Sequence, residues 1–255
     1  MNTELIALVP AAGVGSRAVR PGQQQHVPKQ YQPIHGQPML RHTVRALLAE
    51  DRIAQVCVVV APDDPWVESA LQGLPRCSVL ACGGKTRAET VLNGLRHMAL
   101  SARSWVLVHD AARPGLPLDA LSRLIDQCSS HAVGGLLALP VPDTVKRAAT
   151  VSVPGYEAHT MRGAPAVQTS VDRAGLWLAQ TPQMFRAHLL QLALEQAGPL
   201  NPLMTDESSA LELAGYQPLL VQGSPRNFKV TWPQDFEAMH MWLMHADPAF
   251  DQGES

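Results

Sequence analysis

The stretch LVPAAGVGSRAVRPGQQQHVPKQYQPI, residues 8–34, decides how this chain folds and where it binds a ligand. A short apolar run ends at Pro10, and two glycines and two cations follow, at Gly13, Gly15, Arg17 and Lys29. Glycine has no side chain, so its backbone amides can approach a ligand closely. The stretch therefore predicts a buried strand that ends in an open loop, with positive charge beside it.

Two familiar glycine motifs fit the chain poorly. Residues 13–18 match the dinucleotide-binding pattern G-x-G-x-x-G/A, but that motif needs a helix to begin at once, and Pro21 and Pro28 would break it. Residues 83–86 read GGKT, but a phosphate-binding P-loop needs glycine where Val79 stands. The remaining interpretations are an open loop that receives a base and a triphosphate, and a plain surface loop with solvated cations.

Composition limits the classes of protein. The chain has 255 residues, 46% of them hydrophobic, which suits one sizeable globular domain or one domain with an appendage. Its net charge of −2 disfavours a nucleic-acid coat, so we expect no nucleic-acid partner. No apolar segment approaches the roughly 18 residues that span a bilayer, so we expect a cytoplasmic protein with no membrane contact. The four cysteines form no CxxC pair and are expected to be reduced, at Cys57, Cys77, Cys82 and Cys128.

Apolar runs alternate with helical patterns along the first half of the chain. We expect strands at 4–9, 55–60, 77–82, 104–110 and 134–141. Helices are expected between and after them, at 38–50, 64–72, 86–100, 117–129, 185–197 and 205–214. Nearly continuous apolar strands separated by helices predict an α/β fold, in which a mostly parallel sheet is sandwiched by helices. Ligands then bind beyond the carboxyl ends of the strands.

The pattern changes over residues 142–182, which are rich in Thr and Val and lack a helical period. Residues 172–175 have the composition of a turn between two strands. This segment predicts a β-arm that projects from the sheet and exposes apolar side chains at Val167, Val171, Leu176 and Trp177. A thin arm cannot bury its own apolar face, so we expect the arm of a second copy to cover it in a homodimer.

A second polar cluster lies at the end of a strongly apolar strand. SWVLVHDAARP, residues 104–114, places Asp110 and Arg113 where a central parallel strand would end. An aspartate in that crevice can hold a metal ion or a ribose hydroxyl. The alternatives are a helix N-cap and a local Asp–Arg pair.

Nine motifs then occur in one order and cover almost the whole chain. They are PAAGVGSR (10–17), PKQY (28–31), GGKTRAETV (83–91), VHDAARP (108–114), PVPDTVK (140–146), VDRAGLW (171–177), TPQMF (181–185), TDESSALE (205–212) and NFKVTWPQD (227–235). Together they resemble the 2-C-methyl-D-erythritol 4-phosphate cytidylyltransferase family. The first motif alone is typical of nucleotidyltransferases in general, whereas the ordered set is much narrower.

The resemblance implies a Rossmann-like, GT-A-like nucleotidyltransferase domain over residues 1–255, with 142–182 as an inserted arm for dimerisation. It implies transfer of CMP from CTP to 2-C-methyl-D-erythritol 4-phosphate, with release of pyrophosphate, in the non-mevalonate pathway to isoprenoid precursors. Mg²⁺ or another divalent cation is the implied cofactor, held through the CTP phosphates, with Asp110 as an alternative protein ligand. Such chemistry needs positioned cations rather than a strong base.

The resemblance also assigns roles by position. The implied catalytic residues are Arg17, Lys29, Arg173 and Lys229, with Arg173 reaching in from the partner's arm. The implied nucleotide-binding residues are Pro10, Ala11, Ala12, Gly13, Gly15, Gly84, Lys85, Arg87, Thr90, Asp110 and Ala111. The implied residues for the acceptor substrate are Asp110, Arg113, Thr144, Arg173, Thr181 and Lys229.

The chain departs from the family pattern in a few places. The segment 18–28 is longer than usual, Lys85 stands where an acid is common, and Thr90 replaces a frequent Ser with its hydroxyl retained. Three other functions compete with the implied one. They are a cytidylyltransferase for another polyol phosphate such as ribitol 5-phosphate, an NAD-binding oxidoreductase, and a catalytically silent nucleotide-binding protein.

Overall fold

The computed structural model describes residues 4–13, 27–149 and 165–244. The chain divides into two compact units, one of Met1–Ala138 with Ala179–Ser255 and the other of Leu139–Leu178. Within the described residues, no helix is long and apolar enough to cross a membrane.

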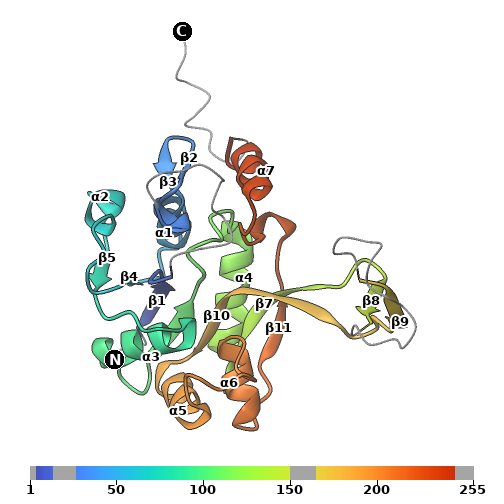
Figure 1. The fold of residues 1–255 in the computed structure, drawn as a ribbon. Helices are drawn as coiled ribbons and strands as arrows, with labels where there is room; N and C mark the ends of the chain where they lie inside the picture. Colours follow the sequence, from blue (N-terminus) through green and yellow to red (C-terminus); the bar gives the residue numbers. More distant parts are fainter. Residues whose placement is uncertain (1–3, 14–26, 150–164, 245–255) are drawn as a thin grey trace. The chain divides into compact units, whose positions relative to one another are not determined.

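A seven-stranded sheet forms the centre of the first unit (Figure 1), in the order β11-β7-β10-β6-β1-β4-β5. Its strands are β1 (Leu5–Pro10), β4 (Gln55–Val59), β5 (Cys77–Leu80), β6 (Trp105–Val108), β7 (Gly134–Pro140), β10 (Trp177–Arg186) and β11 (Leu219–Gln222). The pairs β1–β4, β1–β6, β4–β5 and β7–β11 are parallel, whereas β10 runs antiparallel to β6. The predicted mostly parallel sheet is therefore confirmed.

Helices cover both faces of this sheet (Figure 1). Side chains on β1 alternate between two apolar clusters, because successive residues of a strand point to opposite faces. Ala7 and Val9 join the cluster that includes Leu40 of α1 and Leu121 of α4, while Leu8 joins the cluster of α3, α5 and α6. The helices are α1 (Met39–Leu48), α2 (Val67–Leu71), α3 (Arg87–Met98), α4 (Leu118–Ser129), α5 (Ala187–Ala197) and α6 (Glu207–Leu213). A strand buried on both faces explains the continuous apolar runs.

A third, smaller cluster closes the first unit near its carboxyl-terminal helix. It joins Met39 and Ala112 to Val230, Phe236 and Met239, the last two on α7 (Pro233–Met244). Short elements complete the unit, namely η2 (Lys29–Tyr31), β2 (Pro33–Ile34), β3 (Gln37–Pro38) and η3 (Pro225–Asn227). These elements bring the Lys29 segment and the Lys229 segment onto the same body of the protein.

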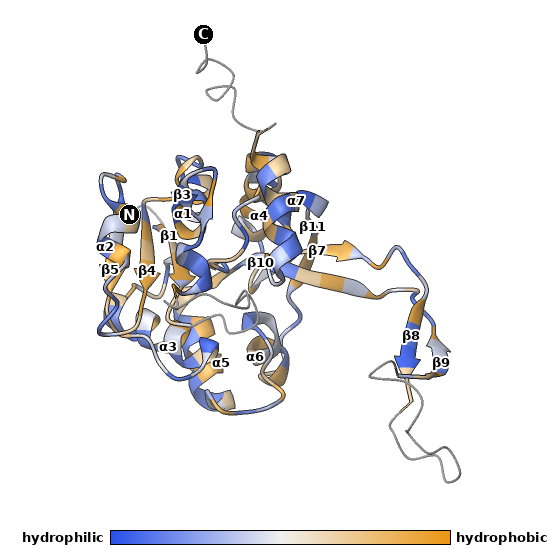
Figure 2. Cartoon of the chain, turned by 45° about the horizontal axis from the view of Figure 1, so that its top comes forward, coloured by the Kyte–Doolittle hydropathy of each residue, from blue (hydrophilic) through white to orange (hydrophobic). Residues whose placement is uncertain are grey.

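The second unit, Leu139–Leu178, contains a two-stranded antiparallel ladder of β8 (Val145–Ala148) and β9 (Val167–Val171). β8 is hydrophilic (Figure 2), and its residues are mostly exposed. The predicted turn after β9 is confirmed, because the backbone amide of Leu176 donates to the carbonyl of Arg173 at 3.0 Å and Gly175 has φ of +75°. Val167 and Leu176 are exposed in the single chain, whereas Val171 and Trp177 are half-buried.

Two strands of the sheet differ from expectation. The residues expected at the end of the arm and the start of a helix, 179–186, instead form the buried half of β10, where Met184 pairs with Leu107 of β6. The edge strand β11 was not anticipated from the sequence, and α5 begins at Ala187.

Candidate active site

A pocket of about 310 Å³ lies at the carboxyl ends of β1 and β6, the edge at which a parallel sheet binds its ligands. Five segments meet there: the glycine loop after β1, η2, the loop from β5 into α3 with the start of that helix, the segment after β6, and the segment at Lys229. The lining residues are Pro10, Ala11, Ala12, Gly13, Lys29, Gln30, Gly84, Lys85, Thr86, Arg87, Thr90, Asp110, Ala111, Ala112 and Lys229.

The start of the glycine loop is held by the buried side chain of Gln30. Its amide nitrogen Nε2 donates to the carbonyls of Ala11 at 2.8 Å and Gly13 at 3.0 Å. The amide of Ala11 donates in turn to the carbonyl of Val59 at 2.7 Å, at the end of β4. A Cβ on Gly13 would meet nothing within 4 Å, so open space lies beside the loop. The loop is thus fixed from behind and free toward the pocket.

The opposite wall is the first turn of α3. Thr86 caps this helix by accepting a hydrogen bond from the amide of Glu89 at 3.0 Å, as a threonine N-cap does. The amide of Gly84 donates to Thr90 Oγ1 at 3.1 Å, and the amide of Lys85 donates to Glu89 Oε2 at 2.6 Å. Both amides are therefore engaged within the wall itself, and the Thr90 hydroxyl is buried behind it.

Asp110 is the centre of charge in the site. Its Oδ1 accepts from Arg87 Nε at 2.9 Å, and its Oδ2 lies 2.9 Å from Lys229 Nζ and 3.4 Å from Arg113 Nε. Burial would by itself raise the pKa of Asp110, but Arg87, Lys229 and Arg113 together hold that pKa well below its usual range. The carboxylate is therefore charged at any pH at which the protein works, as an acceptor of hydrogen bonds and not as an acid.

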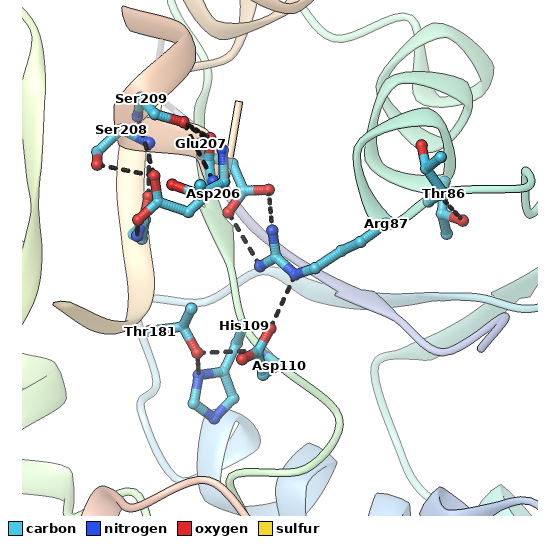
Figure 3. Close-up of polar contacts among 12 residues, drawn as sticks. Thr86, Arg87, His109, Asp110, Thr181, Asp206, Glu207, Ser208 and Ser209 are labelled. Carbon is cyan, nitrogen blue, oxygen red and sulfur yellow. Dashed lines mark hydrogen bonds and ion pairs between the residues drawn. The ribbon is translucent and has the colours of Figure 1, made fainter. Parts of the chain in front are cut away.

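A buried hydrogen-bond chain fixes the backbone of Asp110 (Figure 3). The amide of Asp110 donates to Thr181 Oγ1 at 2.9 Å, and the Thr181 hydroxyl donates to His109 Nδ1 at 3.0 Å. His109 Nε2 then donates to the carbonyl of Arg113 at 3.1 Å, which requires the neutral tautomer with its proton on Nε2. Burial lowers the pKa of His109 to about 4, consistent with that neutral form. The chain ties β6 to β10 behind the pocket.

A second layer of contacts holds Arg87 from the far side (Figure 3). Glu207, the first residue of α6, accepts from Arg87 Nη1 at 2.6 Å and Nη2 at 3.0 Å. Glu207 is buried, which raises its pKa, and Arg87 opposes that rise. Asp206 caps α6 in a capping box with Ser209, so the turn that carries Glu207 is itself fixed.

The two pocket lysines come from opposite ends of the chain. Lys29 Nζ donates to the carbonyl of Val230 at 2.6 Å, and the next residue back, Lys229, pairs with Asp110. Lys29 and Lys229 are thereby placed on one pocket, although 200 positions separate them in the sequence. Such a pair can neutralise phosphate groups.

The structure brings most of the predicted site residues together. Those lining the pocket are Pro10, Ala11, Ala12, Gly13, Lys29, Gly84, Lys85, Arg87, Thr90, Asp110, Ala111 and Lys229. Arg113 and Thr181 contact Asp110 but do not line the pocket, and Thr181 is only 4% exposed. Thr144 and Arg173 are exposed residues of the second unit, where Arg173 Nη1 donates to the carbonyl of Pro142. Gly15 and Arg17 lie outside the described residues.

Four residues of the site were not anticipated: Gln30, Thr86, Ala112 and Glu207. All four lie inside recognised motifs, and the first three stand beside residues that were singled out, so their position was a usable signal. Glu207 sits in the first turn of a helix, where an acid usually serves the helix dipole alone. Its motif, TDESSALE, gave no sign that this acid would pair with Arg87.

The donor set suits a divalent cation that arrives with its own ligands. Asp110 is the one carboxylate among the pocket residues just given, and both of its oxygens already face cations. Within the described ranges, no three His, Cys, Asp or Glu side chains gather as a metal-binding group. Mg²⁺ keeps waters and binds through substrate phosphates in many enzymes, which fits a pocket of this composition.

Fold and pocket together define a nucleotidyltransferase-type α/β protein with a cation-lined site at its sheet edge. The model of the 2-C-methyl-D-erythritol 4-phosphate cytidylyltransferase family matches residues 5–245. The chain belongs to that family. A protein of this name from Bordetella pertussis is 58% identical over 243 residues, which cover 95% of this chain and 100% of the relative. Another, from Laribacter hongkongensis, is 53% identical and covers 90% of this chain and 92% of the relative.

Solved structures agree with this assignment. The crystal structure of a 4-diphosphocytidyl-2C-methyl-D-erythritol synthase matches with a TM-score of 0.78 and 39% identity, over 95% of this chain and 99% of that one. The crystal structure of the 2-C-methyl-D-erythritol 4-phosphate cytidylyltransferase from Thermus thermophilus matches with a TM-score of 0.70 and 28% identity, over 94% of this chain and 100% of that one.

Proposed function

We propose that this protein transfers CMP from CTP to 2-C-methyl-D-erythritol 4-phosphate, giving 4-diphosphocytidyl-2-C-methyl-D-erythritol and pyrophosphate. One observation carries the proposal. The ionised carboxylate of Asp110 is held among Arg87, Lys229 and Arg113, on the same pocket as Lys29 and the glycine loop. That pocket offers cations for two polyanionic substrates and an acceptor for the hydroxyl groups of a polyol. Membership of the family supports the same reaction.

The reaction needs charge neutralisation more than acid–base catalysis. A phosphate oxygen of the acceptor attacks the α-phosphorus of CTP, one P–O bond forms, the bond to the β-phosphate oxygen breaks, and pyrophosphate leaves. The attacking oxygen is already an anion at neutral pH, so no general base has to remove a proton. Lys29 and Lys229 would offset the charge that gathers as the two anions meet. The neutral, buried His109 stays outside this step and supports Asp110.

The base is the second element of recognition. The backbone of residues 10–13 and the wall at 83–90 both line the pocket. Gln30, Thr90 and Glu89 fix these segments, and the peptide groups that remain available there can read the polar edge of cytosine. A site built from fixed polar groups rejects a base whose donors and acceptors are exchanged, because its own groups would be left unpaired. CTP should therefore be preferred to UTP.

Asp110 is placed to receive the acceptor. Its carboxylate can accept hydrogen bonds from polyol hydroxyls, and Lys229 beside it can bind the acceptor phosphate. A bound divalent cation would supply further neutralisation of the triphosphate, with the phosphates and water as its main ligands. Because CTP is a cytoplasmic metabolite, we place the reaction in the cytoplasm.

We also propose a homodimer in which each Leu139–Leu178 unit serves the neighbouring site. Arg173 and Thr144 lie on exposed segments of that unit, and Val167 and Leu178 expose apolar surface there, at 63% and 54%. A thin two-stranded unit cannot bury its own apolar side chains, and a second copy is the simplest cover for them. Arg173 would then add a cation for the acceptor phosphate in the partner's pocket.

A pyrophosphate-release assay tests the function directly. The purified protein should release pyrophosphate with CTP, Mg²⁺ and 2-C-methyl-D-erythritol 4-phosphate, and far more slowly with UTP, ATP or GTP. The acceptor panel includes ribitol 5-phosphate and glycerol 3-phosphate. Faster turnover with ribitol 5-phosphate would replace the proposed acceptor, while turnover with no acceptor at all would remove the transferase assignment.

A further inference from the structure

The Arg87–Glu207 pair is an ion pair at the pocket in which the carboxylate is buried and the arginine side chain is 30% exposed. Arg87 lines the pocket, yet each of its three guanidinium nitrogens has a carboxylate partner: Nε faces Asp110, and Nη1 and Nη2 face Glu207 (Figure 3). The bidentate geometry with Glu207 is the stronger of the two contacts. Three of the five N–H donors of Arg87 are therefore engaged before any ligand arrives.

Glu207 is also built to stay in place. Its side chain is 1% exposed, and it occupies the first turn of α6 behind the Asp206–Ser209 capping box. Gln183 of β10 fixes the same turn, since its Oε1 accepts from the amide of Ser208 at 2.7 Å and its Nε2 donates to Asp206 at 2.9 Å. Burying an unpaired carboxylate costs much free energy, and here Arg87 supplies the opposite charge while the hydrogen bonds around the turn hold Glu207 in place.

A polyanion in the pocket creates a competition for Arg87. A triphosphate offers a guanidinium the same bidentate contact that a carboxylate does, with more negative charge. If Arg87 turned toward the phosphates, Asp110 would lose its partner on Oδ1 and keep only the contacts on Oδ2. Its carboxylate would then be held at one oxygen alone, and acceptor hydroxyls would meet a less firmly oriented group. A fixed counter-charge behind Arg87 prevents this.

We propose that Glu207 is a positioning residue that holds Arg87 on Asp110 in the presence of the triphosphate, so that Asp110 stays oriented for the polyol acceptor. This inference rests on the proposed function for its kinetic test. It replaces the expected role of Arg87 as a nucleotide ligand by a role in the acceptor subsite. It also gives Glu207, in the TDESSALE motif, a task beyond capping a helix.

The kinetic test uses Glu207→Gln, which keeps the shape of the side chain and removes its charge. The KM for the acceptor should rise and kcat should fall, together by roughly 10- to 100-fold, the scale seen when the partner of a site residue is lost. The KM for CTP should stay within about 2-fold of wild type or decrease, since Arg87 is released toward the phosphates. A rise in the KM for CTP would instead make Arg87 and Glu207 part of the nucleotide site and overturn the proposal.

A double-mutant cycle shows whether Glu207 acts through Asp110. In an Asp110→Asn background, Glu207→Gln should cause almost no further loss, because the group it orients has been removed. Full additivity of the two losses would contradict the proposal. Glu207→Asp, which keeps the charge, should recover part of the activity, and it remains available if Glu207→Gln does not fold.

The chain provides a matched control on the same helix. Arg96 and Glu195 also join α3 to a neighbouring helix, at 2.9 Å, but at the surface and away from the pocket. Glu195→Gln should leave all kinetic constants at their wild-type values. If Glu207→Gln also left the kinetic constants unchanged and lowered only the melting temperature, the Arg87–Glu207 pair would be merely structural and the proposal would fail.

A crystal structure separates this inference from the proposed function. With Mg²⁺ and CTP bound to Glu207→Gln, Arg87 should leave Asp110, whereas in the wild-type complex Arg87 Nε should remain at the present 2.9 Å from Asp110 Oδ1. An Arg87 that stays on Asp110 in the variant overturns the positioning role. If the wild-type protein transfers no CMP, the proposed function is wrong, but this comparison of the two structures still tests the role of Glu207.

Discussion

Asp110 and Arg173 are both expected to meet the acceptor substrate, but their surroundings differ completely. Asp110 is 7% exposed, and three cations and a backbone hydrogen bond fix it inside the first unit. Arg173 is exposed on the turn after β9, and its described contact is one backbone carbonyl, that of Pro142. A group of the first kind is positioned by its own chain before a ligand binds. The position of a group of the second kind depends on the molecule that it contacts.

Removing a pocket cation should give the largest effect and would show that the first region carries the chemistry. Lys29→Ala should lower kcat about 10²-fold or more, the scale for losing one preorganised charge contact in a transition state. Steady-state kinetics with both substrates measure it. Lys29→Met, which keeps the length of the side chain, should lose as much. An unchanged kcat with only a raised KM for CTP would make Lys29 a binding residue instead.

Mixing two inactive variants tests whether the second region serves a different chain. Arg173→Ala and Lys29→Ala should each be nearly inactive. After subunit exchange, random pairing makes about half of the dimers hybrid, and each hybrid has one site with both native residues. Activity should recover toward about a quarter of the wild-type value. If mass spectrometry confirms exchange and activity does not recover, Arg173 acts within its own subunit, and the contrast between the two regions is one of exposure alone.

The pH dependence of stability should report on the buried frame of the first region. The folded pKa of His109 is about 4, below the ordinary value of 6.5, so the folded state favours the neutral ring. This contribution is fully present above pH 6.5 and is lost as pH falls toward 4, in total by about 3 kcal/mol. Denaturant unfolding at several pH values measures it, with His109→Gln as the variant that cannot titrate. Parallel curves for the two proteins would show that His109 does not contribute.

The smallest effect is expected at the support of the glycine loop. Gln30→Glu replaces the two amide donors to Ala11 and Gly13 by a carboxylate that repels both carbonyls. The kcat/KM for CTP should fall about 10-fold, the lower end for an unsatisfied buried contact, and the preference for CTP over UTP should narrow. Gln30→Met, which removes the donors without adding charge, separates the two causes. If both variants prefer CTP over UTP as strongly as the wild type does, the glycine loop does not take part in recognising the base.

The sequence predicted the parallel core well, for a physical reason. β1, β4 and β6 are buried on both faces, so their apolar runs are continuous and easily separated from the periodic helices. The buried half of β10 was missed because it carries Gln180, Thr181 and Gln183, polar side chains that are satisfied by specific hydrogen bonds. β11 has four residues, one of which, Leu220, is 49% exposed, so its pattern is weak.

The site was predicted from the sequence only in part. Its ordered motifs supplied Asp110, Lys29 and Lys229 as candidates, and the fold brings these three onto one pocket. The ion pair between Arg87 and Glu207 could not be predicted, because Glu207 lies 120 positions away on α6. Nor could the sequence show that the Thr181 hydroxyl is consumed behind Asp110 by His109 and a backbone amide. Such assignments depend on distances that only the folded chain provides.

The close approach of Gly83 to the glycine loop has a further consequence. A Cβ at this position would lie 2.4 Å from Ala12 Cβ and 2.7 Å from the carbonyl oxygen of Val60. The glycine loop and the loop from β5 into α3 therefore approach each other closely at Gly83. A methyl group at this position would have to push the two segments apart. The spacing of the two segments therefore depends on the absence of a Cβ at Gly83. Because we propose these two segments as the walls of the base subsite, Gly83→Ala should change the preference for CTP over UTP.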